Sequence, residues 1–291
     1  FQMLDVHELT EALQTVNYTF VVLAGASVPL WIALKALKWH LLLNSYWKES
    51  SFSLALNSFL CGFSFGLITP GKVGELSRVL YLPFENRGDG IGLIILDRYC
   101  DLIALLFLAV FGVTHFAGFL YGFLVFLSGA IAASLFFLFP HLLELLCRQN
   151  KFASISNYMN HLRKIPPINS DVFFRVLVIS FSCFVVSVAT SFSLLLSFGD
   201  APLSTALTVF PLTLLTNVLP ITIGNLGVRE GATIYLLGQY GLEKEVAFHV
   251  SILLFVLHSV IPALLGSIIQ PFTRAGRKVK DSQLDRKATN I

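Results

Sequence analysis

Charged residues are scarce in this chain of 291 residues. Asp, Glu, Lys and Arg together make up 13% of the sequence, whereas a soluble domain carries about 25%. Hydrophobic residues make up 55%, and the mean hydropathy is +0.76. So few charges are too few to cover the surface of a soluble protein of this size. We therefore expect an all-α, polytopic integral membrane protein.

The sequence also lacks the patterns that metal centres, disulfide frameworks and nucleic-acid sites leave. The four cysteines lie far apart, with no Cys-x-x-Cys pair and no Cys/His ligand spacing. The net charge is only +3, and no basic stripe suggests nucleic acid. We expect no metal, no cofactor and no nucleic-acid partner, and we interpret the cysteines as packing residues.

Long apolar runs are what the chain has instead. A bilayer core of about 30 Å needs roughly 20 helical residues. Two shorter runs, 52–69 and 204–220, each stop at a proline, and each is followed by a Gly-containing break and a short apolar helix, expected at about 75–83 and 228–238. The five runs long enough to cross are 17–37, 91–113, 119–140, 172–198 and 246–270.

The distribution of Lys and Arg predicts how these segments are threaded, because basic loops stay in the cytoplasm. Lys and Arg gather in 35–50, in 141–171 and in the tail after 273. These segments lie on one side only if 52–69 and 204–220 each return, with a short partner, to the side of entry. The partners are too short to span, so we favour two re-entrant hairpins over hairpins of two full crossings.

The two expected hairpins have opposite orientation and related sequences. The breaks read P-G-K-V-G-E-L from Pro70 and P-I-T-I-G-N-L from Pro220, so that Pro, Gly and Leu match. Inverted repeats with helices broken near mid-membrane are typical of secondary transporters. We expect this architecture here, with half-repeats at about 17–113 and 172–270.

Four other features are assigned from composition. Residues 1–16 hold acidic residues but no Lys or Arg, and their apolar spacing predicts an extracytoplasmic interfacial helix. Residues 17–272 form the expected membrane domain, and 273–291 a basic cytoplasmic tail. A basic-aromatic cluster near the inner surface is typical of an interfacial anchor. The cluster comprises Lys35, Lys38, Trp39, His40, Trp47 and Lys48.

Each break predicts an anion site. Proline ends a helix and glycine permits the turn. Backbone groups freed at membrane depth must face protein or a water-filled cavity. The N-terminus of the following short helix points into that cavity with partial positive charge, and Lys72 adds a full charge at the first break. The expected ligand therefore carries an anion, most simply a phosphate head group.

Ionisable residues inside membrane segments are costly, and each is a functional candidate by default. Glu75 and Arg78 are three residues apart on one short helix, so they either pair or leave Arg78 to bind a phosphate. Arg229 and Glu230 open the second short helix, where Arg229 is a candidate anion ligand. Glu230 is either a helix-start residue or a protonatable gate.

The long run 91–113 contains three further charges, Asp97, Arg98 and Asp101. Two interpretations stay open: an ion cluster that neutralises a basic residue of the first break, or a proton or cation relay. The full candidate binding set is Lys72, Gly74, Glu75, Arg78, Asp97, Arg98, Asp101, Gly224, Asn225, Gly227, Arg229 and Glu230.

Three stretches together resemble the transmembrane region of the lysylphosphatidylglycerol synthase/flippase family. They are TPGKVGELSRVLYL (69–82), DRYCDL (97–102) and LPITIGNLGVREGATIYLL (219–237). The resemblance covers about 3–272. In the third stretch the family pattern is similar to Gly-Gly-Leu-Gly-Val, a variable residue and Glu, and Asn225 replaces one glycine.

This resemblance implies a multi-helix membrane domain that binds or moves a lipid-linked anion. In two-part members this region is the flippase, and a separate soluble domain makes aminoacyl-lipid. The sequence continues only briefly after its last apolar run, so we expect no aminoacyltransferase domain and do not carry over the synthase activity.

We therefore expect a lipid flippase or transporter of the cell (cytoplasmic or inner) membrane. Its partners would be membrane lipids of the anionic phospholipid or polyprenyl-phosphate type. A homo-oligomer and a lipid-modifying enzyme are further partners left open. The alternatives are a membrane enzyme that modifies a lipid head group or polyprenyl-phosphate, and a partner subunit of such an enzyme. The sequence shows no nucleophile-and-base pair and no nucleotide loop that would favour the enzyme.

Overall fold

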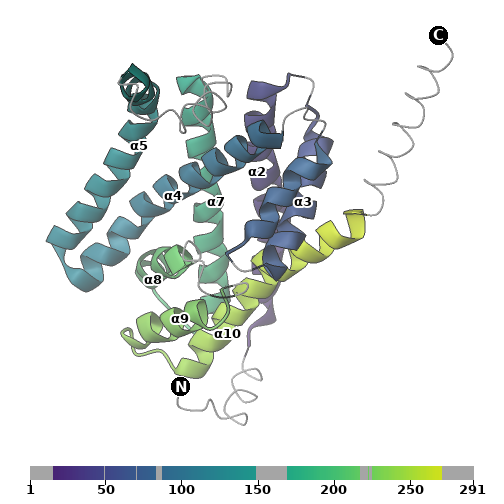
Figure 1. The fold of residues 1–291 in the computed structure, drawn as a ribbon. Coiled ribbons are helices and arrows are strands. Elements are labelled where there is room, and N and C mark those ends of the chain that lie inside the picture. Colours follow the sequence, from purple (N-terminus) through teal and green to yellow (C-terminus); the bar gives the residue numbers. More distant parts are fainter. Residues whose placement is uncertain are drawn as a thin grey trace.

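The computed structural model describes residues 16–48, 50–69, 71–82, 87–148, 169–216, 222 and 225–270 (Figure 1). Within these ranges the chain is helical and contains no strand, which confirms the expected fold class. Several expected features lie outside the described residues: residues 1–15 of the interfacial helix, Pro70, Pro220, Gly224 and the tail 273–291.

Five long helices occupy the five long apolar runs. They are α2 (Tyr18–Tyr46), α4 (Arg87–Ala117), α5 (Phe119–Arg148), α7 (Ser170–Leu196) and α10 (Lys244–Phe255), which continues through the π-helical turn η3 (Val256–Val260) to residue 270. Within the described ranges, four of them (α2, α5, α7 and the continued α10) are long and apolar enough to cross a membrane. The fifth, α4, carries three charged residues in the run 97–101 and is not among these four.

The two shorter runs and their partners form separate elements, as expected. They are α3 (Phe52–Ile68), the 3₁₀ helix η1 (Val73–Tyr81), α8 (Leu203–Leu215) and α9 (Val228–Gly238). The Ser51 side chain caps α3 by accepting a hydrogen bond from the Leu54 N–H. The element η1 has the tighter 3₁₀ winding and packs against α3.

The long helices expose large hydrophobic side chains over much of their outer faces. On α5 these include Phe119, Leu120, Phe123, Leu124 and Leu127. Such a surface would be costly in water but suits lipid tails. Together with the four apolar helices, it identifies the chain as a membrane protein.

The interior is built around α2, which packs between α7 and α3. The helix α4 packs against α5, α7 and α8, and α9 packs against α10. The continuation of α10 closes onto α3, where the Ser64 hydroxyl donates to the Ala263 carbonyl over 2.6 Å. Gly266 sits so close to α3 that a β-carbon there would lie 2.0 Å from the Leu60 carbonyl oxygen.

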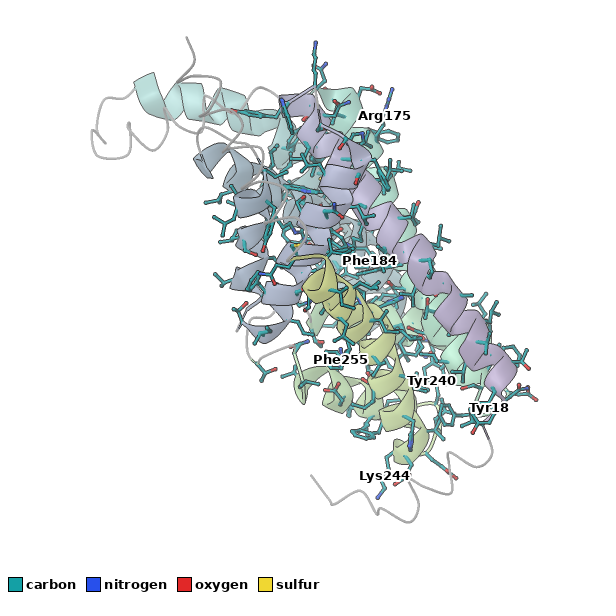
Figure 2. The ribbon with its side chains drawn as sticks, turned by 90° about the vertical axis from the view of Figure 1, so that its right-hand side faces the viewer. Tyr18, Arg175, Phe184, Tyr240, Lys244 and Phe255 are labelled. Carbon is teal, nitrogen blue, oxygen red and sulfur yellow. The ribbon has the colours of Figure 1, made fainter. Side chains whose placement is uncertain are left out.

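Two sets of elements follow one another in the same order. The helices α7, α8, α9 and α10 start 151 to 157 residues after α2, α3, η1 and α4, respectively. The helices α2 and α7 run in opposite directions: Tyr18 at the start of α2 and Arg175 near the start of α7 lie at opposite ends of the molecule (Figure 2). The sequence offset of the two proline breaks therefore extends to the surrounding helices.

Candidate functional site

Two lysines of α2 lie in the protein interior and pair with two aspartates of α4. Lys38 is fully buried, with its Nζ 2.7 Å from Asp97 Oδ1 and 2.6 Å from Asp101 Oδ1. Lys35 Nζ is 2.8 Å from Asp101 Oδ2. The i,i+4 spacing of the aspartates puts both carboxylates on the α4 face that meets the lysines. These contacts join α2 to α4 through charge.

The first break folds η1 back along α3. The Thr69 hydroxyl accepts a hydrogen bond from the Gly74 N–H over 2.7 Å and donates to the Phe65 carbonyl over 3.0 Å. A β-carbon at Gly74 would lie 2.2 Å from that same carbonyl oxygen, so no larger residue fits. Two glycines of α3, Gly62 and Gly66, leave the space that η1 fills. The glycines of α3 therefore allow η1 to pack closely along that helix.

The two charged side chains of η1 fit against these glycines. A β-carbon at Gly62 would lie 2.1 Å from Arg78 Cγ, and one at Gly66 would lie 2.4 Å from Glu75 Cγ. Arg78 is 1% exposed and pairs with Glu75 at 2.8 Å and with Asp97 at 3.2 Å. Of the two interpretations of Arg78, the geometry favours the structural ion pair.

Aromatic rings complete the surroundings of Arg78. Its guanidinium carbon lies 4.9 Å from the centroid of the Phe59 ring and 5.5 Å from that of Trp39. Both distances are in the range of cation–π attraction. Trp39 is itself fixed, because its indole N–H donates to the Ser58 hydroxyl over 2.9 Å. The rings of Trp39 and Phe59 therefore pack against the guanidinium group of Arg78 within the charged network.

Arg98 is the member of the network that reaches the surface. Its guanidinium pairs with Glu75 and lies 4.0 Å from Asp101, while 43% of its side chain remains exposed. Lys72, at the start of η1, has a left-handed backbone with φ 57°. Lys35, Arg98, Arg229 and Asp101 lie within electrostatic reach of its ammonium group.

The second break has its own buried ion pair. Arg229 pairs with Glu230, donates from Nε to the Ser251 hydroxyl over 3.3 Å and lies 4.7 Å from the Phe255 ring centroid. Glu230 also accepts a hydrogen bond from the Gly227 N–H over 2.5 Å, which caps α9. This geometry agrees with the helix-start interpretation of Glu230, and Arg229 has a carboxylate beside it.

Asn225 occupies a backbone conformation that favours glycine. Its φ is 59°, and its amide donates to the Thr216 hydroxyl over 2.9 Å. Asn is the side chain that tolerates the left-handed region best after glycine. The replacement of the expected glycine by Asn225 is thus compatible with the turn. Its neighbour Gly224 lies outside the described residues.

The Lys35–Asp101 and Arg229–Glu230 ion pairs both lie between the two ends of the molecule. In Figure 2, Phe184 and Phe255 lie between Arg175 at one end and Lys244 at the other. Lys35 Nζ is 5.3 Å from the Phe184 ring centroid, and Arg229 contacts Phe255. The charges therefore sit at depth in the helix bundle, where a low dielectric strengthens every electrostatic contact.

The sequence interpretation needs one correction. Lys35, Lys38 and Trp39 are buried, so they are not part of an interfacial anchor. The helix α2 extends to Tyr46, beyond the expected end at residue 37, and this places both lysines well inside it. Of the basic residues assigned to the loop 35–50, only Lys48 lies beyond α2 and exposed.

Two sequence signals could have identified the site residues that the sequence analysis did not assign. Lys35 and Lys38 lie three residues apart in an apolar helix, and their aspartate partners lie four residues apart in α4. The pair Gly62 and Gly66 is a small-xxx-small pattern, which marks a helix face approached closely by another segment. Ser251, which holds Arg229, has no such signal, since an isolated serine in an apolar helix is common.

The comparisons agree with this membrane architecture. The family model for the lysylphosphatidylglycerol synthase TM region matches residues 1–266. No curated protein matches the chain. The match spans all of the helices described above except the last residues of α10, and it contains both breaks. The chain belongs to the lysylphosphatidylglycerol synthase TM region family of membrane proteins.

Proposed function

We propose that this protein is a lipid flippase that binds the anionic head group of a membrane lipid between its two breaks. The observation that carries the proposal is the buried ion network of α2, η1 and α4, which ends in the partly exposed Arg98. Charges held at this depth are costly in a membrane, which makes the network a functional candidate beyond its role in joining the helices. It supplies fixed positive charge along a path that a head group must take.

The residues of the network have different roles in this proposal. Lys38, Arg78 and Asp97 are closed off by mutual pairing, so they hold the site in shape. Arg98 and Lys72 are the groups that can reach a phosphate, since Arg98 is partly exposed and Lys72 lies at the break. A guanidinium binds a phosphate through two parallel hydrogen bonds, and an ammonium binds it as a point charge.

We also propose that the two halves form an inverted repeat with re-entrant hairpins. The shared element order and the opposite directions of α2 and α7 support this proposal. In such an architecture, the two halves rock against each other around a fixed binding site. The π-helical turn Val256–Val260 lies beside Phe255 and so near Arg229, where such turns often mark functional sites. The proposed location is the cytoplasmic membrane, with the C-terminus inside.

Reconstitution tests the proposal directly. Purified protein in liposomes that contain a fluorescent phospholipid should move the lipid between leaflets, as followed by quenching of the outer leaflet. Arg98→Ala and Lys72→Met should each lower the rate by about tenfold or more, because each removes a charge-assisted hydrogen bond worth about 1.5–3 kcal/mol. The matched control is Arg175→Ala, since the Arg175 side chain is 63% exposed on α7 and, within the described ranges, pairs with Asp171 alone.

The assay also separates the alternatives. If Arg98→Ala and Lys72→Met move lipid as fast as the unmodified protein, the site assignment is wrong. If folded protein moves no lipid but changes the head group chemically, the enzyme alternative replaces the flippase. If it does neither, the role of partner subunit remains.

A further inference from the structure

An apolar groove lies apart from the charged network, where α2, α3 and the continuation of α10 meet. Its volume is about 450 Å³, and none of the described residues that line it has a charged or polar side chain. Val28, Ile32 and Leu60 are buried at the groove, whereas Phe52 and Leu265 are each 41% exposed. The groove therefore reaches from the interior of the bundle to its surface and suits an apolar occupant.

The groove opens toward the bilayer. The helices α2 and the continued α10 are both long and apolar enough to cross a membrane. Leu30 and Leu264, which follow and precede the groove residues Pro29 and Leu265, are 54% and 58% exposed. Because such a surface suits lipid tails, the groove is filled from the hydrocarbon layer and not from water.

The sequence of α2 leaves this space empty of protein. Gly25, Pro29 and Ala33 recur every four residues along the groove, and a β-carbon at Gly25 would meet nothing within 4 Å. Pro29 lies inside α2, where its ring disturbs the preceding turn. The facing helices contribute larger side chains at the same spacing. These are Phe52, Leu56 and Leu60 of α3, and Leu257, Ile261 and Leu265 of the continued α10.

The spacing gives the groove its shape. Residues four apart lie on the same face of a helix, so each set of three follows the helix axis. Eight residues of α-helix rise about 12 Å, and one leaflet of a bilayer core is about 15 Å deep. The groove volume also lies in the range of ligand pockets, about 300–1,000 Å³. The dimensions match a hydrocarbon chain that runs along the helices through one leaflet.

We infer that the groove binds one acyl chain of a membrane lipid more tightly than the rest of the lipid-facing surface does. Three helices surround the chain, so it gains dispersion contacts that a single helix face does not offer. This inference does not depend on the proposed head-group site. In the proposed inverted repeat, α2 and α3 belong to the first half and α10 to the second, so the bound chain bridges the two halves.

Photolabelling tests the inference. Detergent-solubilised protein is titrated with a phosphatidylcholine that carries a diazirine in the middle of one acyl chain, and labelled peptides are quantified by mass spectrometry. Labelling of 25–33, 52–60 and 257–265 should saturate at about one lipid per protein. Labelling of 119–127, on the exposed face of α5, should keep rising with lipid. The head group carries no net charge, so the probe reports on the chain.

Variants that fill the groove link this labelling to its shape. Gly25→Leu should lower the labelling of the groove peptides by about fivefold or more and leave that of α5 unchanged, because the new side chain takes the open space. Ala26→Leu is the matched control, since it adds the same side chain at an exposed neighbour outside the groove. Ala33→Phe is a second filling variant, and an unfolding transition recorded for each variant shows that it is folded.

The outcomes are distinct. Saturable labelling that both filling variants lose supports the inference. Labelling that rises without saturation, as on α5, overturns it, and so does full labelling of both folded filling variants. If the groove peptides are not labelled and Gly25→Leu converts a dimer to a monomer in light scattering, a second copy of the chain occupies the groove and the inference is wrong. The head-group site is tested separately by reconstitution, so none of these results bears on it.

Discussion

Removal of the Lys38 charge is the sharpest test of the buried network. Lys38 is fully buried and lies 2.7 Å and 2.6 Å from oxygens of two different aspartates. At an effective dielectric constant of about 20, each contact contributes roughly 6 kcal/mol of Coulomb attraction. Desolvation of the three ions offsets most of that attraction. In Lys38→Met the desolvation of both aspartates remains, while their main counterion is lost.

We expect Lys38→Met to lower the free energy of unfolding by about 3–5 kcal/mol, the range for breaking a buried pair. The lower part of the range applies, because Asp101 still pairs with Lys35 and Asp97 still pairs with Arg78 in the variant. Adding Asp97→Asn should recover at least about 1 kcal/mol, since it removes the charge of a buried carboxylate that has lost its lysine partner.

Unfolding by SDS from mixed micelles, followed by circular dichroism, measures these differences. Lys48→Met is the matched control, because the same change at an exposed lysine should cost less than about 0.5 kcal/mol. The reasoning is refuted if Lys38→Met and Lys48→Met are equally stable. That result would mean that Lys38 reaches the headgroup region, as an interfacial anchor does.

Two further predictions concern the backbone of the breaks. Gly74→Ala should lower stability by about 1–3 kcal/mol through overpacking, because its β-carbon would lie 2.2 Å from the Phe65 carbonyl oxygen. Gly25→Ala in α2, where a β-carbon meets nothing within 4 Å, should be neutral or stabilising in the same SDS titration. Asn225→Ala should cost about 1–2 kcal/mol, because alanine is disfavoured at φ 59°. Asn225→Gly should restore most of that loss, and equal stability of the alanine and glycine variants would contradict the strained turn.

The positions of the helices could be predicted from hydropathy. Each of the five long runs became a helix. The helix α3 ends at Ile68, close to Pro70, whereas α8 contains Pro211 and ends at Leu215. The predicted helix ends were less accurate than the predicted helix positions. The sequence predicts that the first run ends at residue 37, because lysines at 35 and 38 suggest a loop, but α2 continues to Tyr46. Local composition cannot distinguish a lysine that leaves the membrane from a lysine that meets a carboxylate inside it.

The members of the site were partly predictable. Asp97, Arg98, Asp101, Glu75 and Arg78 stood out because ionisable residues are rare in apolar segments, and the structure brings all five together. Their partners on α2 did not stand out, because nothing in the sequence states which helices are neighbours.

The sequence by itself determined that this is a helical membrane protein with two broken segments, because hydropathy and helix breakers act locally along the chain. Tertiary structure alone decided which charges neutralise one another. The pairing of α2 with α4 and the return of η1 along α3 depend on the packing of distant helices. That packing closes Arg78 into an ion pair and leaves the side chain of Arg98 partly exposed.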